Sequence, residues 1–274
     1  NLYGGYLIYP NGAGCHDIDV TNNDLKNCHD IDSMSNCLGT ANSPGSHHLN
    51  FIGNKIHDMG IGAVSGQGFY SYGMYWHADD SLIENNEIYN NSGYGIHMYN
   101  IWPDLADNNI IRNNIFDNNG FGKGASAILL GAGGSYNEAY NNIVYNTGGA
   151  GISVGGYGGP SDNNKVYNNT IVNSLGPCIQ LGSEYSGPDA TLVKNNICWQ
   201  NGLDDIRSEK ATDISADHNF TSDPMFVNLA GGDFHLASGS AALTASDSGG
   251  EVGAFGSGSG PTLKDTTPPS VSIT

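Results

Sequence analysis

The order of apolar and polar residues repeats along most of the chain. In the stretch LIENNEIYN, residues 82–90, apolar residues stand three positions before and two positions after the second asparagine. This pattern recurs at intervals of 31, 32, 28, 28, 27, 27 and 23 residues, with the second asparagine at Asn23, Asn54, Asn86, Asn114, Asn142, Asn169, Asn196 and Asn219. A self-similar period of this length predicts a repeat protein.

A second apolar element follows most of these asparagines. It consists of two apolar residues separated by one other residue, which is the period of a strand; the pairs are Met74 and Trp76, Ile96 and Met98, Ile128 and Leu130, Ile152 and Val154, and Ile179 and Leu181. No helical period is visible. Short strands joined by turns rich in Gly and Asn predict an all-β solenoid, a parallel β-helix whose coils stack about 4.8 Å apart. We expect the recurring asparagines to hydrogen-bond along its axis, as in the amide ladders of stacked strands.

The NN-x-φ-x-N turns and the Gly-φ-x-φ strands, in which φ is an apolar residue, also resemble a known superfamily. Over roughly residues 12–256 the chain is similar to the right-handed parallel β-helix proteins of the pectate-lyase-like superfamily. The resemblance implies a right-handed, single-stranded parallel β-helix of about eight coils with a C-terminal cap. It is specific for the architecture and far less so for the chemistry.

The pattern divides the chain into three parts. Residues 1–223 are predicted to form the β-helix. Residues 224–256 resemble the closing segment of secreted β-helix proteins, with a D-P-φ-F element, a DFHL strand and a terminal GAF, and we expect them to cap the last coil because solenoid ends must be shielded. Residues 257–274 are predicted to be a linker followed by the start of a truncated immunoglobulin-like domain, because DTTPPSVSIT resembles the first strand of such a bacterial module.

The sequence also suggests where the protein works. It carries neither an initiator Met nor a signal peptide, which suggests a processed or excised region of a longer secreted or cell-surface protein with further domains. The net charge of -18, with only nine Lys and Arg, argues against nucleic acid and anionic membranes as partners. A neutral polysaccharide, a cation or a Ca²⁺-bridged polyanion fits better. An open first coil favours self-association end to end.

The chain has five cysteines, so at least one must be free or paired with another chain. Cys198 replaces an inward aliphatic residue, and we interpret it as a small buried hydrophobic residue. Cys15, Cys28 and Cys37 lie in the irregular first coils, where one disulfide bond is as plausible as none.

Strand alternation brings candidate catalytic residues together on an outer face. In the strands around residues 75 and 97 the predicted outward residues are Tyr75, His77, His97 and Tyr99. Adjacent coils would place Tyr75 beside His97, and His77 beside Tyr99. In the following coils a column of glycines predicts a shallow trough beside this cluster, wide enough for a sugar chain.

Other residues would complete a substrate site along the same face. Trp102 and Tyr157, in loops after their strands, would stack on sugar rings, and the later coils offer Gln180 and Arg207. Lys123, Arg112 or a Ca²⁺ ion would neutralise a substrate carboxylate. The candidate Ca²⁺ ligands are Asp79, Asp80 and Asp104.

This set predicts a lyase or C5-epimerase acting on a uronate-containing polysaccharide. Removal of the proton next to a uronate carboxyl needs a base, an acid for the leaving oxygen and a positive group for the enolate. We predict His97 and Tyr75 as base and acid, with His77 and Tyr99 as the alternative pair. In the β-helix alginate epimerases and some lyases of the resembled superfamily, a Tyr and a His share this work. The epimerase signature D-P-H-[DE] is absent here; the sequence HADD at residues 77–80 is only weakly similar to it. The paired Lys and Arg of the chondroitinase-like and pectate-lyase-like branches are also absent.

Two alternatives remain open. A glycoside hydrolase would use paired carboxylates from Asp79, Asp80 and Asp104, although the polygalacturonase-like motifs are missing apart from Asp79-Asp80. A non-catalytic glycan-binding, adhesin or extracellular structural module would need none of this chemistry, because Tyr and His are ordinary residues on the outer face of a half-exposed strand.

Overall fold

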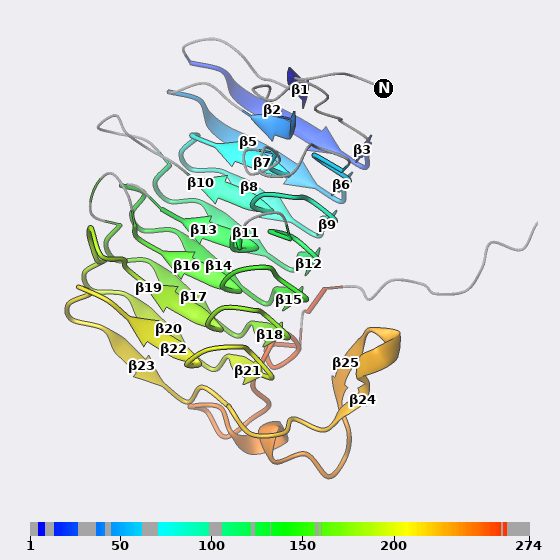
Figure 1. Ribbon diagram of the computed structural model, residues 1–274, viewed down its shortest axis with the longest axis vertical. Helices are drawn as coiled ribbons and strands as arrows, with labels where there is room; N and C mark the ends of the chain where they lie inside the picture. The colour runs from blue at the N-terminus through cyan, green and yellow to red at the C-terminus, as the bar shows by residue number, and fades with distance from the viewer. Residues whose placement is uncertain are drawn as a thin grey trace, which may run out of the picture.

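The computed structural model describes residues 5–8, 14–26, 37–41, 45–61, 71–98, 106–121, 124–131, 133–156, 159, 161–258 and 260–261. Within these residues the chain winds into a stack of coils that runs from β1 to β23 (Figure 1). Each coil contributes one short strand to each of up to three sheets, and strands of successive coils pair in parallel. The predicted parallel β-helix is therefore confirmed.

The first sheet carries Tyr75 and His97. Its eight strands, in order, are β1 (Gly5–Ile8), β4 (Cys37–Ala41), β7 (Met74–Trp76), β10 (Ile96–Met98), β13 (Ile128–Leu130), β16 (Ile152–Val154), β19 (Ile179–Leu181) and β22 (Ile206–Ser208).

The second sheet also has eight strands: β2 (His16–Thr21), β5 (His47–Ile52), β8 (Leu82–Glu84), β11 (Ile110–Arg112), β14 (Glu138–Tyr140), β17 (Lys165–Tyr167), β20 (Leu192–Lys194) and β23 (Ser215–Asp217). The third has seven: β3 (Asp24–Lys26), β6 (Lys55–His57), β9 (Glu87–Tyr89), β12 (Ile115–Asp117), β15 (Ile143–Tyr145), β18 (Thr170–Val172) and β21 (Ile197–Trp199).

The core is a single column of apolar side chains inside the coils. In the middle coils the inward positions predicted from the sequence are fully buried, as Ile83, Ile88 and Ile96 illustrate at 0% exposure. Phe51 and Trp76 pack edge to face inside adjacent coils, with ring centroids 5.3 Å apart. The column ends near β22, where Ile206 is only partly covered, and the side chains of β23 are exposed.

The recurring asparagines form a ladder beside this core. Asn86 donates from its backbone and side-chain nitrogens to Oδ1 of Asn114, both at 2.9 Å, and Asn114 repeats this with Asn142 at 3.0 Å. The same bonds link the eight positions from Asn23 to Asn219. The predicted amide ladder is confirmed.

The asparagine before each ladder position adopts the left-handed backbone conformation of a turn. Asn85, Asn113 and Asn141 have φ values of 56°, 56° and 53°, in the left-handed region that asparagine tolerates better than most residues. The repeated NN pair therefore supplies a left-handed turn residue followed by a ladder residue.

The cysteines differ from the sequence interpretation. Cys198 is not a free buried thiol: it forms a disulfide bond with Cys178, whose Cα lies 5.6 Å away, and both residues are fully buried. Cys15 is free and partly exposed. Cys28 lies outside the described residues, and a disulfide bond among the early cysteines stays a prediction.

Residues 224–258 lie along the flank of the solenoid. This segment contains the antiparallel pair β24 (Phe226–Asn228) and β25 (Asp233–Leu236), with the 3₁₀ turns η2 (Leu229–Gly231) and η3 (Ala241–Thr244) (Figure 1). Phe234 packs on Ile143 and Val172, which point outward from the third sheet. The segment also packs on Ile197 of β21, the last strand of this sheet. That it caps the open end of the core stays a prediction. The domain boundaries at residues 223 and 256 and the immunoglobulin-like domain stay predictions.

None of the described helices is long and apolar enough to cross a membrane.

Candidate functional site

Tyr75 and His97 lie side by side on the outer face of the first sheet. The register of β7 and β10 pairs them directly, as the sequence predicted. Their rings stack with centroids 5.3 Å apart and 17° between planes, and the His77 ring stands edge-on to Tyr75 at 4.5 Å. Tyr75 and His97 are half-buried, while His77 is 9% exposed.

Two further tyrosines complete an aromatic group that the sequence analysis missed. Tyr94 stacks on His97 with centroids 4.5 Å apart, and Tyr72 lies 4.6 Å from the same ring and 5.5 Å from Tyr94. The sequence does contain a signal for them: a Tyr-Gly pair stands directly before both strands, in YGMYW at residues 72–76 and in YGIHM at residues 94–98. We call Tyr72, Tyr75, His77, Tyr94 and His97 the Tyr/His cluster.

Glycine is needed after each of these added tyrosines. A Cβ on Gly73 would stand 2.6 Å from the carbonyl oxygen of Gly95, and a Cβ on Gly95 would stand 2.6 Å from that of Ala127. Only glycine lets successive coils approach this closely at the entry to the strands. The two Tyr-Gly pairs therefore bring Tyr72 and Tyr94 against the His97 ring.

Burial controls the charge of the cluster. Desolvation lowers the pKa of His97 to about 3, and repulsion from His77 adds to this effect, so His97 is neutral around pH 7. Burial also raises the pKa of Tyr94, which keeps its phenol protonated. The cluster thus combines the protonated phenol of Tyr94 with the neutral imidazole of His97 in a partly desolvated patch.

Arg112 does not join the cluster. It belongs to β11 of the second sheet, whereas Tyr75 and His97 belong to the first. Its Nε donates to Oε1 of Glu84 at 2.8 Å, and its Nη1 donates to the hydroxyl of Tyr140 at 3.0 Å. The prediction that Arg112 neutralises a substrate carboxylate at this site is wrong, because the intervening corner turns its strand to another face.

Gln180 and Arg207 lie on the same face as the cluster but farther along. Gln180 lies on β19 and Arg207 on β22, three and four strands beyond β10, and the register pairs the two residues. At about 4.8 Å per strand, Gln180 lies roughly 14 Å from His97. Only an extended ligand would reach both. Arg207 is exposed and paired with Glu209.

The column of glycines does not leave the expected trough. A Cβ on Gly131 would meet the side chain of Leu129 at 2.8 Å, one on Gly155 would meet Pro188 at 3.0 Å, and one on Gly182 would overlap the backbone of Glu209. These glycines allow neighbouring chain to pack closely, so the space beside them is filled.

Asp79 links neighbouring coils through a hydrogen bond. Its Oδ1 accepts the backbone N–H of Asp107 at 2.9 Å, and Asp107 in turn accepts that of Ser135 at 2.7 Å. This second ladder continues through Asp162 to Asp189. Burial raises the pKa of Asp79, with added repulsion from Asp107 and Asp80. Asp80 is exposed with a φ of 47°.

Several predicted site residues lie outside the described residues: Tyr99, Trp102, Asp104, Lys123 and Tyr157. Their roles stay predictions. In the part of the chain that the structure describes, no three His, Cys, Asp or Glu side chains are arranged to hold a metal ion. The Ca²⁺ site therefore also stays a prediction.

Comparison with solved structures reveals an architecture shared with an alginate epimerase. A mutant of the periplasmic alginate epimerase AlgG superposes with a TM-score of 0.54 at 15% identity, covering 79% of this chain and 48% of that one. Pectate lyase Pel9A gives a TM-score of 0.49 at 13% identity, over 93% of this chain and 86% of that one. An alginate lyase from Paenibacillus sp. str. FPU-7 gives 0.41 at 16% identity, over 79% and 76%. This chain thus spans about half the length of the epimerase.

The family assignment comes from the sequence of the coils. No curated protein matches the sequence. Residues 39–223 match the family described as "Right handed beta helix region", and this match covers more than half of the chain. The chain therefore belongs to the right-handed β-helix family.

Proposed function

We propose that the protein is a secreted polysaccharide lyase or C5-epimerase that transfers protons at a uronate unit through the Tyr/His cluster. The observation that carries this proposal is the pairing of Tyr75 with His97 across adjacent coils, with His77 edge-on to Tyr75 at 4.5 Å. The fold shared with a protein named as an alginate epimerase supports the same substrate class.

The low pKa of His97 changes the roles expected from the sequence. A base works best when its pKa lies near the working pH, and a pKa of about 3 makes His97 a weak base. His97 is better suited to remain neutral and donate a hydrogen bond to the substrate carboxyl group, as neutral imidazoles do in other enzymes. His77 and Tyr75 then remain as base and acid.

The two reactions share their first step. His77 takes the C5 proton, and the electron pair of the C5–H bond moves into the carboxyl group as an enolate. In a lyase, a C4–C5 double bond forms, the C4–oxygen bond breaks, and Tyr75 protonates the leaving oxygen. In an epimerase, Tyr75 returns a proton to C5 from the opposite side. Lys123 or Ca²⁺ is the proposed source of positive charge for the enolate.

The experiment follows both products with one substrate panel. Alginate, pectate and glycosaminoglycans are incubated in D₂O, with and without EDTA. Elimination is read from the absorbance of the unsaturated uronide, and epimerisation from deuterium at C5. Tyr75→Phe and His77→Gln are each expected to lower the rate at least about 100-fold. Tyr140→Phe, which removes a half-buried phenol from the second sheet, is the matched control and should retain the rate.

A second candidate function is glycan binding without chemistry. The rings stacked around His97 offer an apolar platform of the kind that sugar rings contact. No product from any polymer, together with binding that Tyr75→Ala weakens, would replace the enzyme proposal with this one. Full activity in both Tyr75→Phe and His77→Gln would contradict the assigned roles.

A further inference from the structure

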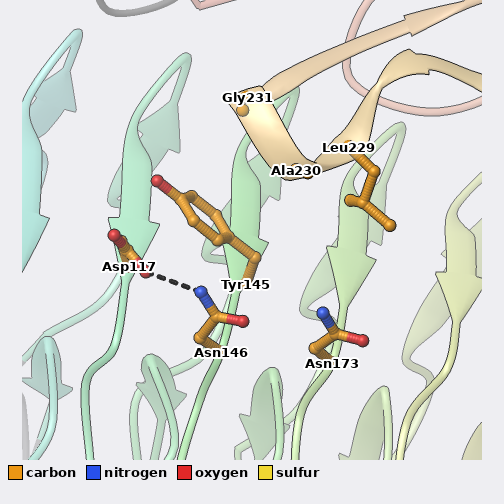
Figure 2. Close-up of a pocket in the computed structure, with 8 residues that line it drawn as sticks. Asp117, Tyr145, Asn146, Asn173, Leu229, Ala230 and Gly231 are labelled. Atoms are coloured by element: carbon orange, nitrogen blue, oxygen red, sulfur yellow. Dashed lines mark hydrogen bonds between the residues drawn. The ribbon is translucent and has the colours of Figure 1, made fainter.

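A groove lies between the flank of the solenoid and the C-terminal segment. It has a volume of about 680 Å³. One wall is formed by Asp117, Tyr145, Asn146 and Asn173 of the solenoid, and the other by residues 229–232 around η2 (Figure 2). It belongs to the third sheet, whereas the Tyr/His cluster lies on the first. The volume is in the range of sites that bind small ligands.

The solenoid wall offers polar groups at regular intervals. Asp117, Asn146 and Asn173 come from three successive coils, because β12 pairs with β15 and β15 pairs with β18. Asn146 and Asn173 occupy equivalent turn positions, with φ values of 55° and 56°, and their amides lie side by side (Figure 2). Their spacing is about one strand separation, ~4.8 Å. This is roughly the length of one sugar ring in an extended chain.

The polar groups on this wall form a connected set. The Nδ2 of Asn146 donates to Oδ1 of Asp117 at 3.0 Å, and Tyr145 is also hydrogen-bonded to Asp117. Burial, followed by the charge of Asp117, raises the pKa of Tyr145, so the phenol stays protonated at physiological pH. The wall therefore presents carboxylate and amide oxygens as acceptors and an amide as a donor, in fixed positions.

The opposite wall is ordered and partly apolar. Asn228 caps the start of η2, because its Oδ1 accepts the N–H of Gly231 at 3.0 Å, and Gly232 follows the turn with a φ of 78°. Leu229 packs with the apolar group under the segment, and Phe234 holds the Tyr145 ring at a centroid distance of 5.0 Å. An apolar edge facing a row of hydrogen-bonding groups suits a sugar ring, which has both kinds of surface.

The charges of the groove define the ligand class. No Lys or Arg lines it, and Asp117 lies on its wall. Glu87 is close enough to Tyr145 to contribute to its raised pKa. A polyanion would be repelled here. Asp117 already accepts bonds from Tyr145 and Asn146, so a bare cation would have to displace them. A neutral, hydroxyl-rich ligand meets neither obstacle.

We propose that this groove is a second carbohydrate site that binds a neutral oligosaccharide lying along the solenoid axis. The docked C-terminal segment then has a role besides covering the third sheet, because it supplies the second wall. The proposal does not depend on the Tyr/His chemistry, since the two sites lie on different sheets.

The test measures binding to the full chain by titration calorimetry. The probes are neutral hexasaccharides of glucose, mannose, galactose and xylose, with a uronate hexasaccharide for comparison. Asn173→Gly removes one groove amide while keeping a residue that accepts positive φ. Gln200→Gly is the matched control, because Gln200 occupies the next equivalent turn position, has a φ of 55° and lies outside the groove lining.

At least one neutral hexasaccharide is expected to bind. Asn173→Gly and Asp117→Asn should each weaken that binding about tenfold, as expected for one lost hydrogen bond to a fixed group. Gln200→Gly should bind like the parent chain, and so should His97→Gln, which separates this site from the Tyr/His cluster. The proposal is overturned if none of the neutral probes binds, if Asn173→Gly and Gln200→Gly bind equally, or if the uronate probe binds more tightly in this groove.

Discussion

At the scale of the residue, each asparagine of the repeat has one task set by its position. Asn86 is 1% exposed and donates to Asn114 and to the carbonyl oxygen of Phe51, at 2.8 Å for the latter. It also accepts two bonds from Asn54. Asn85, its neighbour in sequence, is exposed and has positive φ. Identical residues next to each other therefore differ in their contribution to stability.

The first prediction compares these two residues. Asn86→Ala leaves buried backbone and amide groups of two coils without partners, and we expect a loss of about 2–4 kcal/mol in the free energy of unfolding. Asn85→Gly keeps the turn and should change stability by about 0.5 kcal/mol or less. Urea denaturation measures both. Equal losses would mean that the ladder does not stabilise the coils.

The second prediction concerns the charge of His97. Its pKa is lowered to about 3 in the folded protein, from the ordinary value of 6.5. Between these values the unfolded chain binds a proton that the folded chain does not, so His97 stabilises the fold above pH 6.5 and loses that effect as the pH falls. The contribution falls by up to about 1.4 kcal/mol per pH unit.

The measurement is the free energy of unfolding between about pH 4 and 7, in the parent chain and in His97→Gln. On acidification, the free energy of unfolding should fall more steeply with pH in the parent chain than in His97→Gln. His235→Gln is the control, because His235 is exposed. Parallel pH curves for the parent and His97→Gln would show that His97 is not held neutral.

At the scale of the element, a disulfide bond joins two strands that belong to different sheets. Cys178 directly precedes β19 of the first sheet, and Cys198 lies in β21 of the third. The sequence indicated that position 198 points inward, but its partner depends on which two inward positions meet across the interior. That relation is fixed by the cross-section of the coil and is invisible in the repeat.

The third prediction follows from the burial of this bond. Both cysteines are fully buried, so dithiothreitol should leave the disulfide intact in the native protein while partly exposed Cys15 reacts with iodoacetamide. The double variant Cys178→Ala/Cys198→Ala should lose about 3 kcal/mol of stability, because the bond closes a loop with a sequence separation of 20 residues. Mass spectrometry and denaturation measure the two effects. Rapid native reduction would contradict the assigned burial.

At the scale of the whole molecule, the C-terminal segment covers part of the outer face of the third sheet. Ile143 and Ile197 point outward from β15 and β21, yet they are buried under this segment. Polar bonds fasten it as well: Lys194 pairs with Asp247 at 2.7 Å, and the backbone N–H of Ala254 donates to Thr170 at 3.0 Å. The solenoid and the segment therefore bury, against each other, apolar surface that each would expose on its own.

The fourth prediction tests this packing. Phe234 is 2% exposed between the segment and the sheet. Phe234→Ala should therefore weaken the packing of the segment on the sheet by about 3–5 kcal/mol of free energy. Limited proteolysis should then cut within residues 224–258 before the coils. Val227→Ala is the control, because Val227 is 57% exposed on the same segment. Simultaneous cleavage of coils and segment would show that the two unfold as one unit.

The sequence by itself determined the coils, the inward side chains, the asparagine ladder and the meeting of Tyr75 with His97. All of these follow from one period, because stacking equal coils brings equivalent positions together. The tertiary structure alone decided that Arg112 faces elsewhere, that Cys178 meets Cys198, that the space beside the glycines is filled, and that residues 224–258 lie on the flank. These relations depend on the angles between sheets and on packing across the coil. A linear repeat records neither, because it fixes which residues stack on one another in successive coils and leaves open which residues face them across the coil.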